Sequence, residues 1–227
     1  MISMKLAALC SGGKDSTYAL WLALRQEHEL AYLVAMQPAR EGSWMFHYPN
    51  IHLMDLFSEC VALPLVKAET SGVKEQELED LRETLRPLEV EGVVSGAIAS
   101  TYQKSRIDRI CKELGLESLT PLWGREPLEL LNEMLAAGFE IIITSVSAEG
   151  FDETWLGRKI DRGCLKDLRM LQEKFGINPS GEGGEYESLV LDASFFRKRI
   201  EPLKLEQVWR GDSGHLIVSK ARLEEKS

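Results

Sequence analysis

Short apolar segments alternate with amphipathic segments through the first two-thirds of the chain. Strands are predicted where nearly every residue is apolar, at residues 5–10, 29–36, 63–67 and 92–98. Helices are predicted where apolar residues recur every three or four positions, at residues 16–27, 51–60, 74–88 and 102–114. Uniformly apolar strands separated by helices are typical of a parallel sheet that helices cover on both faces.

The regular alternation weakens after residue 146, and we place a domain boundary near residues 121–125. Beyond it the pattern predicts helices at 128–137 and 163–175, a strand at 140–146, a glycine-rich loop at 178–186, and short strands at 189–191, 203–209 and 216–219. We therefore expect an α/β fold. A doubly wound, Rossmann-like parallel sheet would occupy residues 1–123, and a smaller C-terminal α+β domain would occupy residues 124–227.

Composition and charge narrow the class of protein. The 227 residues are 44% hydrophobic and 28% charged, as in soluble globular proteins, so a mainly disordered chain is excluded. The 27 Lys and Arg residues are outnumbered by 36 Asp and Glu residues, which gives a net charge of −9 at pH 7. Because such a charge repels nucleic-acid backbones and anionic lipid, we expect neither a nucleic acid nor a membrane as partner.

The cysteines and the N-terminus indicate a cytoplasmic location. Cys10, Cys60, Cys111 and Cys164 form no CxxC pair, so we expect buried free thiols rather than zinc or iron–sulfur ligands. No apolar run approaches the roughly 18 residues that a membrane span needs. The first apolar run is also too short for a secretory signal. An interior, reducing compartment is therefore expected.

The segment most informative about function is SGGKDS, residues 11–16, between the first predicted strand and the first predicted helix. Two adjacent glycines let backbone N–H groups approach an anion, and the helix N-terminus adds partial positive charge. Lys14 adds a full charge, while Ser11 and Ser16 add hydroxyl donors. The spacing differs from the Walker A and GxGxxG motifs. The alternative, a helix-initiating turn capped by Asp15 or Ser16, would not require two glycines and a lysine together.

Three further segments carry candidate chemistry: SWMFH at residues 43–47, SGAIASTYQKSR at 95–106, and GEGGEYES at 181–188. Ligands of open parallel sheets bind outside the carboxyl ends of the strands, so residues 95–106 are expected beside residues 11–16. The alternative for residues 95–106 is a solvated helix start. In residues 181–188, three glutamates would raise one another's pKa unless a cation lies among them, and the alternative is a solvated acidic turn.

The hexapeptide at residues 11–16 resembles the SGGxDS loop of the N-type ATP pyrophosphatases. The four segments together resemble the diphthine–ammonia ligase (diphthamide synthase) family of that superfamily, from the first strand to at least residue 188. The resemblance implies an adenine nucleotide alpha-hydrolase-like fold and a ligase that forms a C–N bond and uses ATP and Mg²⁺. Residues 1–123 would then bind the nucleotide, and residues 124–227 would recognise the substrate.

The resemblance also implies roles for individual residues. Those expected to bind ATP are Ser11, Gly12, Gly13, Lys14, Asp15, Ser16, Gly96 and Arg106. Those expected to bind the substrate are Tyr102, Gln103, Glu182, Gly183, Gly184, Glu185, Tyr186 and Glu187. Lys14, Asp15 and Glu185 are the expected catalytic residues, with Asp15 facing magnesium and Lys14 facing the phosphates. We expect Lys14 and Asp15 in an exposed loop, and we expect residues 181–188 to act apart from the ATP site.

The implied reaction is the amidation of diphthine, a modified histidine of translation elongation factor 2, to diphthamide. The diphthine carboxylate would attack the α-phosphorus of ATP, and ammonia from free ammonium would convert the acyl-adenylate into the amide, with AMP and pyrophosphate released. A tRNA-modifying ATP pyrophosphatase is the alternative enzyme, which the acidic charge balance disfavours. A non-catalytic ATP-binding module is the other alternative, which the three-glutamate loop disfavours. The sequence leaves the oligomeric state open, a homodimer included.

Overall fold

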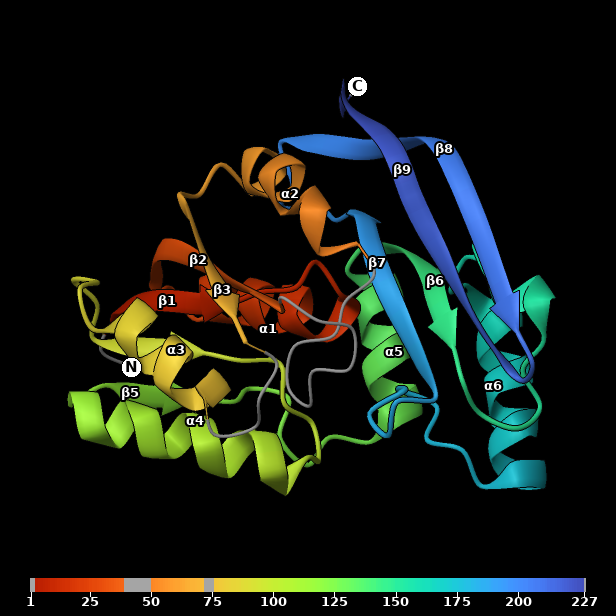
Figure 1. Cartoon of the computed structure of the whole chain (residues 1–227), viewed down its shortest axis with the longest axis horizontal. Coiled ribbons are helices and arrows are strands. Elements are labelled where there is room, and N and C mark those ends of the chain that lie inside the picture. Colours follow the sequence, from red (N-terminus) through yellow and green to blue (C-terminus); the bar gives the residue numbers. More distant parts are fainter. Residues whose placement is uncertain (1–2, 39–49, 72–75, 227) are drawn as a thin grey trace.

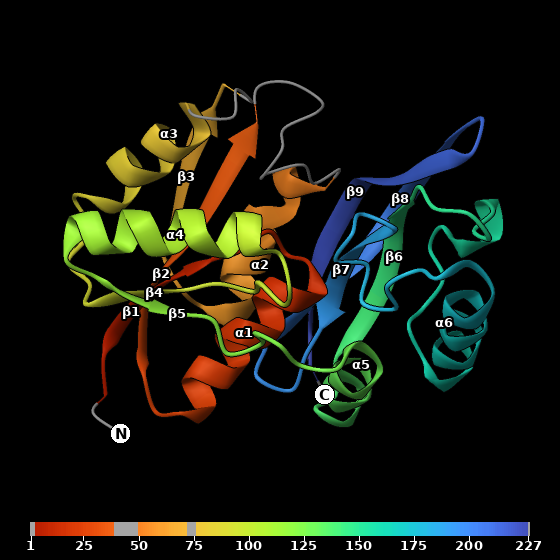
Figure 2. The ribbon, with the colours of Figure 1, turned by 90° about the horizontal axis from the view of Figure 1, so that it is seen from below.

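The computed structural model describes residues 3–38, 50–71 and 76–226. Segment 43–47, which contributes to the family resemblance, lies outside these residues. Two sheets lie side by side, each with its own helices (Figures 1 and 2). The N-terminal sheet has the order β3-β2-β1-β4-β5 and is entirely parallel. The C-terminal sheet has the order β7-β6-β9-β8 and is antiparallel.

Helices cover both faces of the N-terminal sheet. Its strands are β1 (Lys5–Leu9), β2 (Glu29–Pro38), β3 (Leu65–Thr70), β4 (Gly92–Val94) and β5 (Glu117–Leu119). Its helices are α1 (Lys14–Arg25), the 3₁₀ turn η1 (Ile51–Leu53), α2 (Met54–Val61), α3 (Gln76–Leu85) and α4 (Thr101–Leu114). Helices α3 and α4 lie on one face of the sheet, and α1 and α2 lie on the other (Figures 1 and 2).

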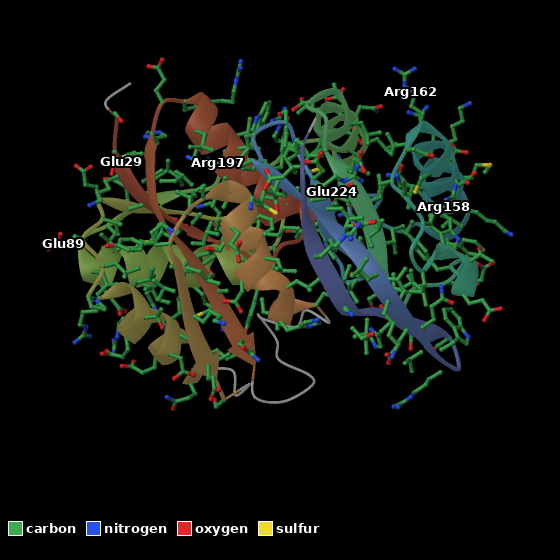
Figure 3. All side chains as sticks on the ribbon, turned by 90° about the horizontal axis from the view of Figure 1, so that it is seen from above. Glu29, Glu89, Arg158, Arg162, Arg197 and Glu224 are labelled. Carbon is green, nitrogen blue, oxygen red and sulfur yellow. The ribbon has the colours of Figure 1, made fainter. Side chains whose placement is uncertain are left out.

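The C-terminal half places its helices beside a sheet that ends in a long hairpin. The strands are β6 (Glu140–Val146), β7 (Tyr186–Asp192), β8 (Lys198–Arg210) and β9 (Ser213–Glu225). The helices are α5 (Pro127–Ala136), the 3₁₀ turn η2 (Glu153–Trp155) and α6 (Arg162–Phe175). In Figure 3, Glu29 and Glu89 lie at the N-terminal end of the molecule and Arg158 and Arg162 lie at the opposite end.

One hydrophobic core joins the two halves. Alternate residues of β1 point to opposite faces, as the two-residue repeat of a strand requires. Ala7 packs with the residues under α3 and α4. Leu6 and Ala8 belong to the larger cluster that continues through α1 and α2 into the C-terminal sheet, where it includes Leu189. At the same junction the Arg197 amide donates to the Cys60 carbonyl at 2.7 Å. The two sheets are therefore held in a fixed relation.

The fold class expected from the sequence is confirmed, with differences in the extent of some elements. Strand β5 was not predicted because it has only three residues. Strand β4 ends at Val94, where the chain turns toward α4, rather than continuing to residue 98. Strands β8 and β9 are each 13 residues long, far longer than predicted. The unpredicted residues at the ends of both strands are mainly charged or polar, so the hydrophobic pattern does not reveal them.

Two expectations about the chain as a whole are also tested by the structure. Each of the four cysteines is free and buried, as predicted. Among the helices in the described ranges, none has the length and apolar character needed to cross a membrane.

Candidate active site

A cavity of about 390 Å³ opens where the two halves meet. Its walls come mainly from three segments: residues 9–16, the turn after β4 with the start of α4, and residues 181–188. Val34 and Met36 of β2 and Ile51 of η1 complete the lining. The first two of the three segments lie at the carboxyl ends of β1 and β4, where ligands of open parallel sheets bind. The structure therefore brings three of the four segments singled out from the sequence into one site.

The phosphate loop, residues 11–16, is organised by its own hydrogen bonds. Gly12 has φ +78°, a conformation that favours glycine, and Gly13 is the N-cap of α1. The Ser16 hydroxyl donates to the Gly13 carbonyl at 3.1 Å and lies 3.3 Å from the Ser11 hydroxyl. The loop thus places the N-terminus of α1 at the cavity before any ligand arrives.

Gly96 allows the turn after β4 to lie directly on the phosphate loop. A Cβ atom at this position would lie 2.6 Å from the Asp15 carbonyl carbon and 2.6 Å from the Ser16 nitrogen. Both are backbone atoms, which cannot move aside easily. Gly96 lines the cavity, and its small size also sets the distance between two of the cavity's walls.

Lys14 is buried, with 3% of its side chain exposed, so the expectation that it lies in an exposed loop is wrong. Its ammonium donates to Asp15 Oδ2 at 2.7 Å and to the Ser180 carbonyl. It also lies 5.0 Å from the centroid of the Tyr186 ring. Lys14 therefore connects the phosphate loop to the C-terminal half while remaining in the wall of the cavity.

Asp15 is half-buried, with one buried oxygen that is unused. Burial raises the pKa of its carboxyl above the ordinary value, and the Lys14 ammonium opposes that rise. Its Oδ1 atom is buried and has no hydrogen-bond partner within the described ranges. A buried oxygen of this kind is suited to a cation or to a donor on a ligand.

Glu182 reaches across the cavity to the N-terminus of α4. Its Oε1 accepts hydrogen bonds from the backbone N–H groups of Ile98 at 3.1 Å, Ala99 at 2.9 Å and Ser100 at 2.9 Å. Hydrogen bonds from a helix N-terminus to a carboxylate are stronger than hydrogen bonds between two neutral groups. Figure 2 shows the loop that carries Glu182 near this end of α4.

Glu185 turns into its own loop. Its Oε1 accepts from the Asn178 N–H at 2.8 Å, and its Oε2 accepts from the Gly183 N–H at 2.8 Å. It does not line the cavity. Gly183 and Gly184 are exposed at the rim, and Gly184 has φ +86°.

Glu187 and Tyr186 form the part of the wall next to Lys14. Burial raises the pKa of Glu187 to about 7; the Lys14 ammonium lowers it, and Asp15 and Glu182 raise it further. Burial also raises the pKa of Tyr186. The Tyr186 hydroxyl donates to the Pro179 carbonyl at 2.8 Å, which fixes the ring beneath the loop.

The expectation that residues 181–188 act apart from the phosphate loop is wrong. The Lys14 N–H donates to the Ser188 hydroxyl at 3.2 Å, and the Val190 N–H donates to the Gly12 carbonyl at 2.9 Å. Both segments line the same cavity. A change in the C-terminal loop can therefore alter nucleotide binding.

On α4, Tyr102 and Gln103 line the cavity but Arg106 does not. The Arg106 guanidinium lies 3.5 Å from the Tyr102 ring centroid and donates to the Tyr102 carbonyl at 3.3 Å. It is therefore placed to support Tyr102 from behind. Its predicted contact with ATP stays a prediction.

Sequence reasoning did not select Ser95, Ser180 or Ser188, although all three belong to the site by contact. Ser95 lines the cavity, Ser180 accepts from Lys14, and Ser188 accepts from the Lys14 backbone. The available signal was that Ser95 and Ser188 lie in the segments 95–106 and 181–188, which the sequence marks as candidate binding segments. No sequence signal identifies the carbonyl of Ser180.

Metal ligands are sparse in the part of the chain that the structure describes. No group of three or more His, Cys, Asp or Glu residues there could hold a metal ion by itself. Mg²⁺ is commonly held by one or two carboxylates together with substrate phosphates and water. Asp15, with its unpartnered oxygen, fits that pattern.

Comparison with known proteins identifies the family. A family model described as the diphthamide synthase N-terminal domain matches residues 4–118. One described as the diphthamide synthase C-terminal domain matches residues 126–223.

Curated relatives agree with the family models. The diphthine–ammonia ligase of Mus musculus is 36% identical to this chain, and the match covers 98% of this chain and 94% of the mouse protein. That of Homo sapiens is 36% identical over 87% of this chain and 82% of its own length. That of Schizosaccharomyces pombe is 35% identical over 96% of this chain, but this match covers only 39% of the yeast protein.

A solved structure, described as a predicted subunit of a tRNA methyltransferase from Methanocaldococcus jannaschii, is 14% identical with a TM-score of 0.41. The match covers 84% of this chain and 98% of the solved one. The two family models together span most of the sequence, and the relatives are enzymes named as ligases. The chain belongs to the diphthine–ammonia ligase (diphthamide synthase) family.

Proposed function

We propose that the protein is an ATP-dependent ligase that amidates diphthine on translation elongation factor 2, using ammonium and releasing AMP and pyrophosphate. The observation that carries the proposal is the shared cavity. It unites a glycine-rich anion loop at a helix N-terminus with an acidic loop from the other half of the chain. A nucleotide and a cationic second substrate would need these two surfaces together.

In this proposal the phosphate loop holds the pyrophosphate part of ATP. The N-terminus of α1 and the hydroxyls of Ser11 and Ser16 face the cavity and would stabilise negative charge on the leaving group. Asp15 would hold Mg²⁺, which, when bound, neutralises phosphate charge. Lys14 supports both through its ion pair with Asp15.

The reaction would proceed in two steps, adenylation of the carboxylate and then amide formation. The diphthine carboxylate attacks the α-phosphorus of ATP, and the bond to pyrophosphate breaks. Ammonia then attacks the acyl carbon, and AMP leaves. A carboxylate is a poor electrophile, and adenylation replaces a poor leaving group with a good one. Holding both substrates in one cavity supplies proximity.

Glu187 is suited to the proton transfer that the second step requires. Ammonium has no lone pair and must lose a proton before it can attack. A carboxyl group whose pKa burial raises to about 7 exchanges protons readily near neutral pH. Glu187 lies in the cavity wall and is itself part of the acidic loop that would attract the ammonium cation.

The direct test is a product analysis with ATP labelled at the α-phosphate. We expect labelled AMP only when elongation factor 2 bearing diphthine and ammonium are both present, together with a gain of the amide on the factor. The control is elongation factor 2 with an unmodified histidine. AMP formation that depends on tRNA would favour a tRNA-modifying pyrophosphatase. ATP that is bound but never cleaved would favour a non-catalytic module, and either result would refute the proposal.

A further inference from the structure

The N-terminus of α4 carries three backbone N–H groups that converge on a single oxygen atom. The N–H groups of Ile98, Ala99 and Ser100 donate to Glu182 Oε1 at 3.1, 2.9 and 2.9 Å. Glu182 belongs to a loop more than 80 residues further along the sequence. We propose that these three N–H groups form an oxyanion site, which Glu182 occupies in this conformation and which an oxyanion of a substrate takes during turnover. We call this set of three groups the α4 cradle.

The geometry of the α4 cradle defines the class of its ligand. Three converging N–H groups at the start of a 14-residue helix favour a negatively charged oxygen. The group found there is a carboxylate, which shows directly what kind of oxygen the cradle accepts. Phosphate and carboxylate oxygens share this chemistry.

A second observation points to a ligand at the same place. Ser95 is 4% exposed, and its hydroxyl is buried with no hydrogen-bond partner in the described part of the chain. Ser95 lines the cavity on the same turn that leads from β4 to the α4 cradle. A buried hydroxyl is normally paired, so one left unpaired in a cavity wall indicates a missing partner. The Ser95 hydroxyl makes no hydrogen bond to the Glu182 oxygen held in the cradle, so its acceptor would be a second oxygen of a phosphate or carboxylate ligand.

The loop around Glu182 would respond to such a ligand. Ser180 accepts from the Lys14 ammonium, and Ser188 accepts from the Lys14 N–H. Residues 180–188 thus satisfy donors of the phosphate loop as well as those of the α4 cradle. An anionic substrate competes with the protein's own acceptors for these donors. Removing one internal competitor should therefore strengthen binding of the external anion.

The inference rests on the proposed function only for the source of the oxyanion, which would be the phosphate of AMP, pyrophosphate or the substrate carboxylate. Its test is equilibrium binding to the full chain by calorimetry, which does not require amidation. The probes are AMP, pyrophosphate and acetate. The variants are Glu182→Ala, Glu182→Gln and Ser95→Ala, and Glu173→Gln on the exposed face of α6 is the matched control.

We expect Glu182→Ala to lower the dissociation constant of at least one probe about tenfold, the effect of removing one charged hydrogen-bonding competitor. Glu182→Gln should change it in the same direction by less, because the amide oxygen still accepts but carries no charge. Ser95→Ala should weaken the same probe about threefold, and Glu173→Gln should change nothing. The probe that tightens identifies the source of the oxyanion.

Two results would overturn the inference. The first is a Glu182→Ala protein that binds all three probes as the unmodified protein does, or more weakly; Glu182→Gln is judged by the same criterion if the alanine variant does not fold. The second is a Ser95→Ala protein with unchanged affinity for every probe. If tightening is found but no amidation is ever detected, the oxyanion site stands and the proposed function fails.

Discussion

The two loops that face each other across the cavity are built in different ways. The phosphate loop is shaped by backbone conformation at Gly12 and by hydrogen bonds within residues 11–16. The loop at residues 178–188 also has local bonds, from Asn178 and Gly183 to Glu185, but in addition it depends on the long reach of Glu182 to the α4 cradle. The first loop is therefore determined locally, and the second depends in part on tertiary contacts. Changes in the first should affect chemistry directly, and changes in the second should, apart from those at Glu187, act through position.

The largest effect is expected from Asp15→Asn in the phosphate loop. The substitution keeps the shape of the side chain and removes the charge that pairs with Lys14 and would hold Mg²⁺. We expect AMP formation to fall by roughly a thousandfold, about 4 kcal/mol of lost transition-state stabilisation. Steady-state assay of labelled AMP measures it, with circular dichroism to confirm the fold. Turnover within threefold of the unmodified protein would remove Asp15 from the reaction.

Gly96→Ala tests the contact between the phosphate loop and the turn after β4. The new Cβ atom would lie 2.6 Å from backbone atoms of Asp15 and Ser16, so the two segments must separate. We expect unfolding in urea to show a loss of about 3 kcal/mol. The matched control is Gly115→Ala, where φ is +70° but no atom lies within 4 Å. It should cost only about 1 kcal/mol. Equal losses would mean that the contact is unimportant.

The same difference explains what the sequence could predict. The N-terminal sheet was predictable because buried parallel strands are apolar throughout and amphipathic helices separate them. The phosphate loop was predictable because its glycines and charges are adjacent in the sequence. The hairpin of β8 and β9 was predicted only as two short strands, because its outer residues, such as Lys198, Arg222 and Glu224, are charged and give no apolar pattern.

Within the site, residue identity was easier to predict than side-chain direction. The glutamates of residues 181–188 were selected together, yet they point to different places. Glu182 binds the α4 cradle, Glu185 binds within its own loop, and Glu187 faces Lys14 and Asp15. These directions depend on backbone groups brought close only by the fold. The burial of Lys14 by Ser180 and Tyr186 has the same cause.

Glu187→Gln should change how stability depends on pH. The pKa of Glu187 is about 7 in the folded protein against an ordinary 4.5, so the folded chain holds the proton more tightly than the unfolded chain. The contribution of this group is fully favourable below about pH 4.5 and is lost as pH rises through 7.

Glutamine does not titrate, so the variant should gain about 2 kcal/mol relative to the unmodified protein between pH 5 and pH 8. This gain is smaller than the whole pKa shift of Glu187 would give, because the side chain is half-buried and solvent screens part of its charge. Urea unfolding at both pH values measures the difference. Glu173→Gln, on an exposed helix face, serves as the control and should show none. A parallel pH profile for Glu187→Gln and the unmodified protein would contradict the raised pKa.

Arg106→Ala should have the smallest effect, because Arg106 supports the cavity without lining it. Its guanidinium stacks on Tyr102, whose ring does line the cavity, so the loss should loosen Tyr102 rather than remove a ligand contact. We expect the KM for ATP or for the protein substrate to rise about threefold to fivefold, with kcat nearly unchanged. Arg109→Ala is the control, because Arg109 is exposed on the same helix and forms a surface ion pair with Glu113 at 3.7 Å, away from the cavity. A loss of a hundredfold or more in kcat/KM would contradict a supporting role. It would instead favour the direct contact with ATP that the sequence predicts, and α4 would then bind the nucleotide through a side chain as well as through its N-terminus.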